Sequence, residues 1–269
     1  MKIPIYQVDA FTGKLFGGNP AAVCPLEKWL DSETMQNIAG ENNLAETAFY
    51  VKEAEGFHIR WFTPAIEIDL CGHATLASAH VIFNHSDFKG EVVAFQSKSG
   101  TLKVSRGGAA QELLTLDFPA NKPGFVAGIP PRLVEALGLK PTVLSKARDL
   151  LALYETEKDI LSIKPNFEVL SEVLTDIGCL GMIVTAPGKT VDFVSRFFAP
   201  LAGINEDPVT GSAHTILIPY WAEKLGKNKL HAFQLSQRKG ELFCQLAGAG
   251  DRVLIGGKAV TYLKGEIYV

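Results

Sequence analysis

The feature that most constrains the fold is a repeat. The segment RWFTPA at residues 60–65 recurs as RFFAPL at residues 196–201, about half the chain later. In each copy acidic residues follow, and then a Gly-x-Ala opens an apolar helix pattern, at Gly72 in the first copy and at Gly211 in the second. A short pattern can occur twice by chance. Chance seldom also places the same helix start after both copies. The sequence therefore predicts two similar halves.

The segments between the repeated motifs have the pattern of an α+β protein. Short runs such as residues 57–62 are rich in β-branched and aromatic residues and indicate strands. Residues 31–43 have the pattern of a helix whose N-cap is Asp31 or Ser32. Residues 74–83 are apolar on nearly every side, so we expect them to form a helix inside the protein rather than on its surface.

The length of 269 residues allows one large domain or two of about 130 residues. The repeat favours two. We place the halves at residues 1–118 and 119–269, and leave open whether the last strand returns to the first half. The Pro/Gly-rich segment at residues 121–131 is the best candidate for a linker.

The composition indicates in which cellular compartment the protein is found and which classes of partner it binds. The net charge is -3, and Lys and Arg form no basic cluster, which argues against nucleic acid and anionic membranes as partners. The chain has no apolar run of about 20 residues and no signal-peptide pattern, so we expect a soluble cytoplasmic protein. Its four cysteines are widely separated, without a CxxC pair or histidines at zinc-ligand spacing. Neither a metal nor a nucleotide cofactor is expected, because the glycine-rich nucleotide motifs are missing as well.

The two predicted helix starts at Gly72 and Gly211 are candidates for binding an anion. The first N–H groups of a helix have no partner within it, and this end carries about half a positive charge. Small residues there let a ligand approach the backbone. In a molecule with two similar halves we expect the two starts to face one another across a cleft and to bind a small anionic metabolite.

Three further side chains are candidates for the chemistry. Glu46 is a lone acid in a segment with the pattern of a buried strand, so it is either paired structurally or functional. Asp207 precedes the second helix start, as Asp69 precedes the first, although Asp-Pro is also a common turn pair. His73 lies at the first helix start, where the dipole favours a neutral imidazole that contacts the substrate. A histidine that only satisfies a carbonyl remains the alternative. Cys71 is most simply a small buried hydrophobe.

Five separated motifs resemble, in order and across nearly the whole chain, the PhzF-like family, named after an isomerase of phenazine biosynthesis. They are DAFTGKLFGGNPAAV, NNLAETAFY, RWFTPAIEIDLCGHATLASAHV, RFFAP and EDPVTGSAHTILIPYWAEKLG. The resemblance implies a diaminopimelate epimerase-like fold, in which each half is a barrel-like mixed β-sheet wrapped around a central apolar helix. It also implies a homodimer.

The resemblance assigns roles by motif. It implies that Glu46 moves a proton without a metal or an organic cofactor, and that His73, Asp207 and Ser212 surround the substrate. Backbone amides at Gly72 and Gly211 would bind the substrate carboxylate. It also implies that Cys71 is not catalytic, because the two thiols of the epimerase are replaced by alanines, Ala77 and Ala213.

The first interpretation is thus a cofactor-independent isomerase of a small carboxylated metabolite. The alternatives are a non-catalytic binding or scaffolding protein with the same fold, and a racemase or hydrolase that depends on Cys71. The sequence does not identify the substrate.

Overall fold

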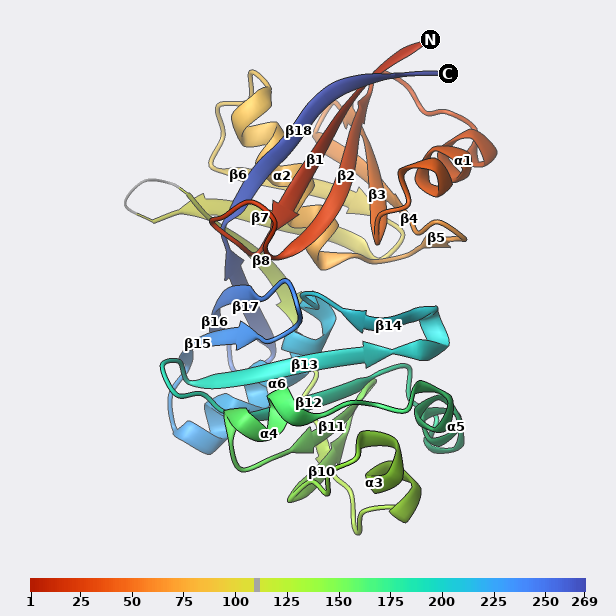
Figure 1. Ribbon diagram of the computed structural model, residues 1–269. Coiled ribbons are helices and arrows are strands. Elements are labelled where there is room, and N and C mark those ends of the chain that lie inside the picture. Colours follow the sequence, from red (N-terminus) through yellow and green to blue (C-terminus); the bar gives the residue numbers. More distant parts are fainter. Residues whose placement is uncertain (109–111) are drawn as a thin grey trace. The chain divides into compact units, whose positions relative to one another are not determined.

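The computed structural model describes residues 1–108 and 112–269 (Figure 1). These residues form two compact units. The first unit contains Met1–Asp117 and Gly256–Val269, and the second contains Phe118–Ile255. In the part of the chain that is described, no helix combines the length and apolar character needed to cross a membrane.

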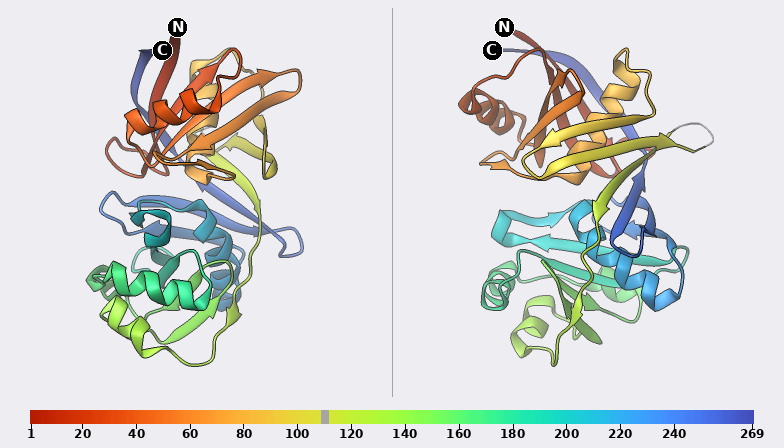
Figure 2. Two further views of the ribbon diagram at one scale, coloured as in Figure 1. Left: turned by 90° about the vertical axis from the view of Figure 1, so that its right-hand side faces the viewer. Right: turned by 180° about the vertical axis from the view of Figure 1, so that it is seen from behind.

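In its described residues the first unit has nine strands and two helices, and the last of its strands before the crossing, β8, extends to the first residues of the second unit. In chain order they are β1 (Lys2–Ala10), β2 (Asn19–Leu26), α1 (Ser32–Asn42), β3 (Glu46–Glu53), β4 (Gly56–Phe62), β5 (Glu67–Ile68), α2 (Gly72–His85), β6 (Val92–Ser97), β7 (Gly100–Gly107), β8 (Leu113–Pro119) and β18 (Ala259–Tyr268). The two chain ends lie side by side, because β18 runs antiparallel to β1 (Figure 2).

The second unit has nine strands, four α-helices and one short 3-10 helix. They are β9 (Gly124–Phe125), α3 (Pro131–Leu137), β10 (Val143–Lys146), β11 (Leu150–Leu153), α4 (Glu157–Ser162), α5 (Phe167–Ile177), β12 (Met182–Pro187), β13 (Phe193–Ala199), η1 (Pro200–Ala202), β14 (Ile204–Asp207), α6 (Gly211–Leu225), β15 (Lys229–Gln234), β16 (Gly240–Ala247) and β17 (Arg252–Gly257).

The strand pairing of the first unit recurs in the second. β2 is parallel to β3 and β3 is antiparallel to β4, just as β11 is parallel to β12 and β12 is antiparallel to β13. β4 is parallel to β6, and β13 is parallel to β15. β1 pairs with β18 as β10 pairs with β9. The repeat in the sequence is therefore a repeat of topology.

The repeated Arg-x-Phe motif ties equivalent strands together. Arg60 on β4 donates two hydrogen bonds to Glu67 on β5, both 2.8 Å long. Arg196 on β13 donates two hydrogen bonds, of 2.8 and 2.9 Å, to Glu206 on β14. Each guanidinium lies over the ring of the phenylalanine two residues later, at 5.2 and 4.9 Å from the centroid. Such bidentate and cation–π contacts require arginine, which explains why these residues recur.

The two long apolar helices form the centres of the units. Most of the 14 residues of α2 are buried, and the helix contacts β1, β2, β3, β7 and β18. α6 is buried along most of its length in the same way and packs on β15 and β16. The prediction that residues 74–83 form an interior helix is confirmed. The capped helix is also confirmed, because the Asp31 side chain accepts a hydrogen bond from the backbone N–H of Thr34.

The predicted linker at residues 121–131 is wrong. Gly124 and Phe125 form β9, which pairs with Lys146 and Ser145 on β10 inside the second unit. The Pro and Gly residues there punctuate a short strand and the start of α3 instead. The chain crosses between the units at Asp117–Phe118 and again at Ile255–Gly256.

Candidate active site

Glu46 is the first residue of β3, and its side chain is buried. Asn43, the residue after α1, adopts the left-handed conformation with φ 49°, so the chain turns sharply before it enters β3. Glu46 then pairs with Ala21 in the parallel ladder between β2 and β3. The residue is 7% exposed. The prediction that Glu46 is an acid within a buried strand is thus confirmed.

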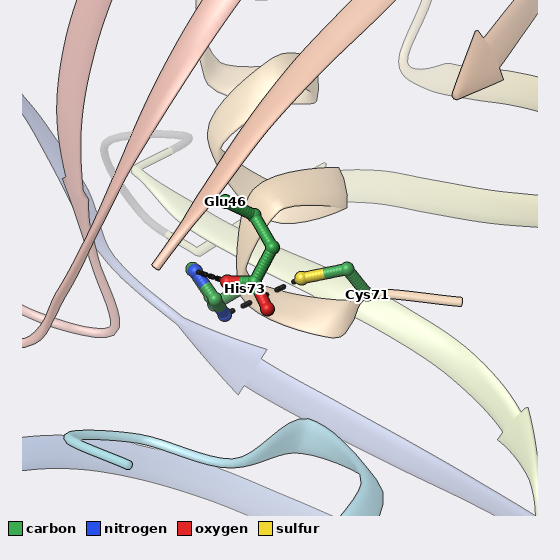
Figure 3. Close-up of side chains that lie close together, drawn as sticks. All are labelled: Glu46, Cys71 and His73. Carbon is green, nitrogen blue, oxygen red and sulfur yellow. Dashed lines mark hydrogen bonds and ion pairs between the residues drawn. The ribbon is translucent and has the colours of Figure 1, made fainter. Parts of the chain in front are cut away.

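His73 is the second residue of α2 and is 4% exposed. The residue before the helix, Cys71, is extended, and its carbonyl accepts hydrogen bonds from the backbone N–H and the hydroxyl of Thr75. From this first turn the imidazole points toward Glu46 at the start of β3 (Figure 3).

Glu46 and His73 meet inside the first unit. Nε2 of His73 lies 3.0 Å from Oε2 of Glu46, and both side chains are over nine-tenths buried (Figure 3). The two groups are not aligned as a hydrogen bond, so the contact is electrostatic in this conformation. Burial strengthens the attraction between a carboxylate and an imidazolium at this distance.

The other ring nitrogen of His73 has two neighbours. Nδ1 lies 3.2 Å from the amide nitrogen of Asn19 and 3.5 Å from Sγ of Cys71. Asn19 is fully buried and begins β2. We did not predict this residue, although it lies in the GGNP segment of the first PhzF-like motif. Cys71 is buried as predicted, and its thiol lies against the ring of His73.

The electrostatics of His73 differ from the prediction. We expected the helix start to favour a neutral imidazole. Burial does oppose the charged form, but Cys71 and Glu46 outweigh it and raise the pKa of His73 well above its ordinary value. The prediction failed because the neighbouring carboxylate comes from a distant part of the sequence. An opposite charge 3.0 Å away favours the charged form of the imidazole.

Among the residues that the structure describes, Glu46, Cys71 and His73 form a group that could hold a metal ion. Each offers a ligand atom, and the three atoms lie within 4.8 Å of one another. Zinc takes thiolate, imidazole and carboxylate ligands. Burial, and then the charge of Glu46, raise the pKa of Cys71, which opposes the thiolate that zinc needs. The three side chains therefore fit a zinc ion poorly.

Asp207 lies at the end of β14 in the second unit, held by a network of side chains. The hydroxyl of Thr210 donates to Oδ2 of Asp207 at 2.5 Å. Gln234, fully buried at the end of β15, donates to the carbonyl of Asp207 at 2.8 Å and accepts from the N–H of Thr210 at 2.9 Å. His214 contacts the carbonyl of Thr210 through Nδ1 at 2.8 Å. Gln234 and His214 were not among the predicted site residues.

The predicted match between Asp207 and Asp69 is wrong by one residue. Phe197 pairs with Asp207 in the second unit, and Trp61, its counterpart in the repeat, pairs with Ile68 in the first. The first unit therefore has an isoleucine where the second has this aspartate. The Asp69 side chain is 73% exposed.

Both predicted helix starts are confirmed, since α2 begins at Gly72 and α6 begins at Gly211. Neither N-cap residue, Cys71 or Thr210, forms a side-chain cap. Gly72 is partly exposed, and so is Ser212, the second residue of α6. Glu46, His73 and Gly72 thus share the first unit, whereas Asp207, Gly211 and Ser212 share the second.

Comparison with known proteins agrees with this architecture. Residues 8–265 match the family described as Phenazine biosynthesis-like protein. The chain is 48% identical to an uncharacterized isomerase of Pseudomonas aeruginosa, with 100% of both chains covered. It is also 48% identical to a PhzF family phenazine biosynthesis protein crystallised from Enterococcus faecalis, with a TM-score of 0.94 and 100% of both chains covered.

Distant structures share the fold alone. A hydroxyproline epimerase from Agrobacterium vitis is 11% identical, with a TM-score of 0.65 over 99% of this chain and 92% of that one. The predicted α+β, epimerase-like fold is therefore confirmed.

Proposed function

The chain belongs to the phenazine biosynthesis-like protein family, and on that premise we propose that it is an isomerase that moves a proton within a small carboxylated metabolite. The observation that carries the proposal is the buried contact between Glu46 and His73 at 3.0 Å. An ionisable pair shielded from water is the arrangement that acid/base catalysis uses.

In the proposed reaction Glu46 is the group that moves the proton. Its carboxylate takes a proton from one carbon of the substrate, which breaks a C–H bond and forms an O–H bond. The electron pair shifts through an adjacent double bond, and the same carboxyl returns the proton to another carbon on the same face. Nothing is oxidised or reduced, and the step balances with Glu46 as both the base and the acid. His73 presents an N–H to Glu46 and to the substrate as charge develops.

The remaining site residues are proposed to bind the substrate. The first N–H groups of α2 and α6, at Gly72 and Gly211, suit a carboxylate, because both helices begin without a side-chain cap. Asp207 and Ser212 suit the substrate's amino or hydroxyl groups, and the Thr210–Gln234 network holds the Asp207 backbone in place. The ligand would thus be a small anion with polar substituents. The resemblance to the family also leads us to propose a homodimer.

Isotope exchange tests this function while the substrate is still unidentified. The protein is incubated in D2O with fractionated carboxylated metabolites, and each fraction is analysed by mass spectrometry. An isomerase of this kind converts one metabolite into an isomer of the same elemental composition, and deuterium enters that isomer whenever the Glu46 carboxyl exchanges its proton with solvent before returning it. A non-catalytic binding protein retains a metabolite without isomerisation or exchange, and that result across all retained metabolites would refute the proposal.

A further inference from the structure

The two ring nitrogens of His73 face different chemistry. Nε2 faces the carboxylate of Glu46 at 3.0 Å, and Nδ1 faces the side-chain amide of Asn19 at 3.2 Å. A neutral imidazole carries one proton, on either nitrogen, and the partners of the ring decide which. The position of that proton determines whether His73 presents a donor or a lone pair to Glu46.

The amide nitrogen of Asn19 is only a donor, so the atom that it faces must offer a lone pair. In His73 that atom is Nδ1, which places the single proton of the neutral ring on Nε2. We propose that Asn19 is a positioning residue that holds neutral His73 in the Nε2–H tautomer. The opposite tautomer would set an N–H against the Asn19 amide and a lone pair against the Glu46 carboxylate. Both contacts would be repulsive.

The other neighbour of Nδ1 does not select a tautomer. Sγ of Cys71 lies 3.5 Å away. A thiol is a weak donor and a weak acceptor, and its hydrogen rotates to suit its partner. Cys71 can therefore donate to a bare Nδ1 or accept from a protonated one. The selection depends on Asn19, whose amide is the stronger donor.

The backbone before Asn19 keeps its amide in place. Gly18 has φ +59°, and a Cβ there would lie 2.0 Å from the carbonyl oxygen of Ala10, so this turn requires glycine. Asn19 then pairs with Ala10 in the β1–β2 ladder. The loop is closed by the backbone N–H of Phe16, which donates to the buried Asp9 carboxylate at 2.8 Å. A side chain anchored in this way can orient its neighbour.

Asn19 acts on the reaction through His73. This consequence rests on the proposed function, in which Glu46 cycles between carboxylate and carboxyl. The raised pKa of His73 favours the charged ring beside the carboxylate. The neutral Nε2–H tautomer therefore applies once Glu46 has taken up the proton, and it keeps a donor directed at Glu46 as the carboxylate forms again. The tautomer itself is a property of the folded protein and is measured without substrate.

Nitrogen-15 NMR of histidine-labelled protein tests the proposal. The His73 resonances are assigned with a His73→Gln variant, and the wild-type ring is titrated to its neutral form. We expect a protonated Nε2 and a bare Nδ1. Asn19→Asp replaces the donor by an acceptor, so it should shift His73 to the Nδ1–H tautomer and raise its titration midpoint. Asn84→Asp is the matched control, because the Asn84 amide lies 3.2 Å from Nδ1 of His80, and it should leave His73 unchanged.

Three results would overturn the assignment: an Nδ1–H tautomer in the wild type, a His73 that stays doubly protonated throughout the stable pH range, or a folded Asn19→Asp protein with an unchanged tautomer. The wild-type spectrum alone tests for the first two of these results, so the proposal can be refuted even if the Asn19→Asp variant does not fold. Once a substrate is known, Asn19→Asp should lower kcat by at least ~10-fold with little change in KM. If the NMR spectrum shows the predicted tautomer but the protein has no exchange activity, the proposed function is refuted and the role of Asn19 is still supported.

Discussion

Nε2 of His73 lies 3.0 Å from Oε2 of Glu46, although one residue begins helix α2 and the other begins strand β3. The two elements meet because α2 packs against β2 and β3 at the centre of the first unit. The acid and the imidazole are therefore brought together by the fold rather than by a local motif. Changes at the residues that set this geometry lead to the predictions below.

Cys71 contacts His73 but should not be the group that moves the proton. Burial raises the pKa of its thiol, so the reactive thiolate is disfavoured. Cys71→Ala should keep deuterium exchange within ~3-fold of wild type and lower the free energy of unfolding by about 1 kcal/mol. Cys24→Ala, which removes another fully buried thiol, is the matched control. Exchange that disappears in Cys71→Ala but not in Cys24→Ala would favour a cysteine-dependent racemase.

Gln234 should stabilise the second unit through the turn that carries Asp207. Gln234→Leu leaves the buried N–H of Thr210 without the acceptor it has in the wild type. Leaving a buried group unpaired costs ~1–3 kcal/mol, and this substitution also removes the donor to the Asp207 carbonyl. We expect a loss of about 3 kcal/mol in urea unfolding. Gln96→Leu, on the exposed side of β6, should change stability by ~0.5 kcal/mol or less. Equal effects of the two substitutions would show that the network is unimportant.

Gly18 should be intolerant of any side chain. In Gly18→Ala the new Cβ would meet the Ala10 carbonyl oxygen, so the β1–β2 turn must shift. A control is Gly138→Ala, where φ is also positive, at +70°, but no atom lies within 4 Å of the added Cβ. The control should cost ~1 kcal/mol for the backbone conformation alone, and Gly18→Ala should cost at least ~3 kcal/mol. Thermal or urea unfolding compares the two, and similar losses would rule out the steric explanation.

His214 should make the protein sensitive to acid. Its buried imidazole has a pKa lowered from 6.5 to about 4, chiefly by burial. The unfolded chain therefore takes up a proton at a higher pH than the folded one. This contribution to stability is present above pH 6.5 and is lost as the pH falls toward 4, by up to about 3 kcal/mol.

The acid sensitivity is measured by urea unfolding at a series of pH values. His214→Phe should remove this part of the pH dependence, although it also loses the contact with the Thr210 carbonyl at every pH. The partly exposed His231 provides the control, His231→Phe. An acid slope in His214→Phe equal to that of the wild type would contradict the assignment.

The repeated architecture could be predicted from the sequence because its signals are local. Arg60 and Glu67 are 7 residues apart, and Arg196 and Glu206 are 10 residues apart, so each motif and its contact lie within a short stretch of sequence. The apolar helix α2 could be predicted for the same reason, since a helix without a polar face must be buried.

Side chains that act across long sequence separations could not be predicted. Asn19 reaches His73 only because of the β1–β2 turn, and Gln234 reaches Thr210 from the end of β15. A single Asn or Gln has no sequence pattern that marks it as buried. The comparison of Asp69 with Asp207 failed because a shift of one residue in a strand moves a side chain to the other face.

The most direct test of the account is the exchange rate of Glu46→Gln with the metabolite that the D2O screen identifies. Glutamine keeps the size of the side chain but cannot take up the proton. Deuterium exchange should fall by at least ~10²-fold, while the dissociation constant of the metabolite changes by ~3-fold or less. Glu53→Gln, at the exposed end of the same strand β3, should exchange like the wild type. Wild-type exchange in a folded Glu46→Gln protein would contradict the central claim.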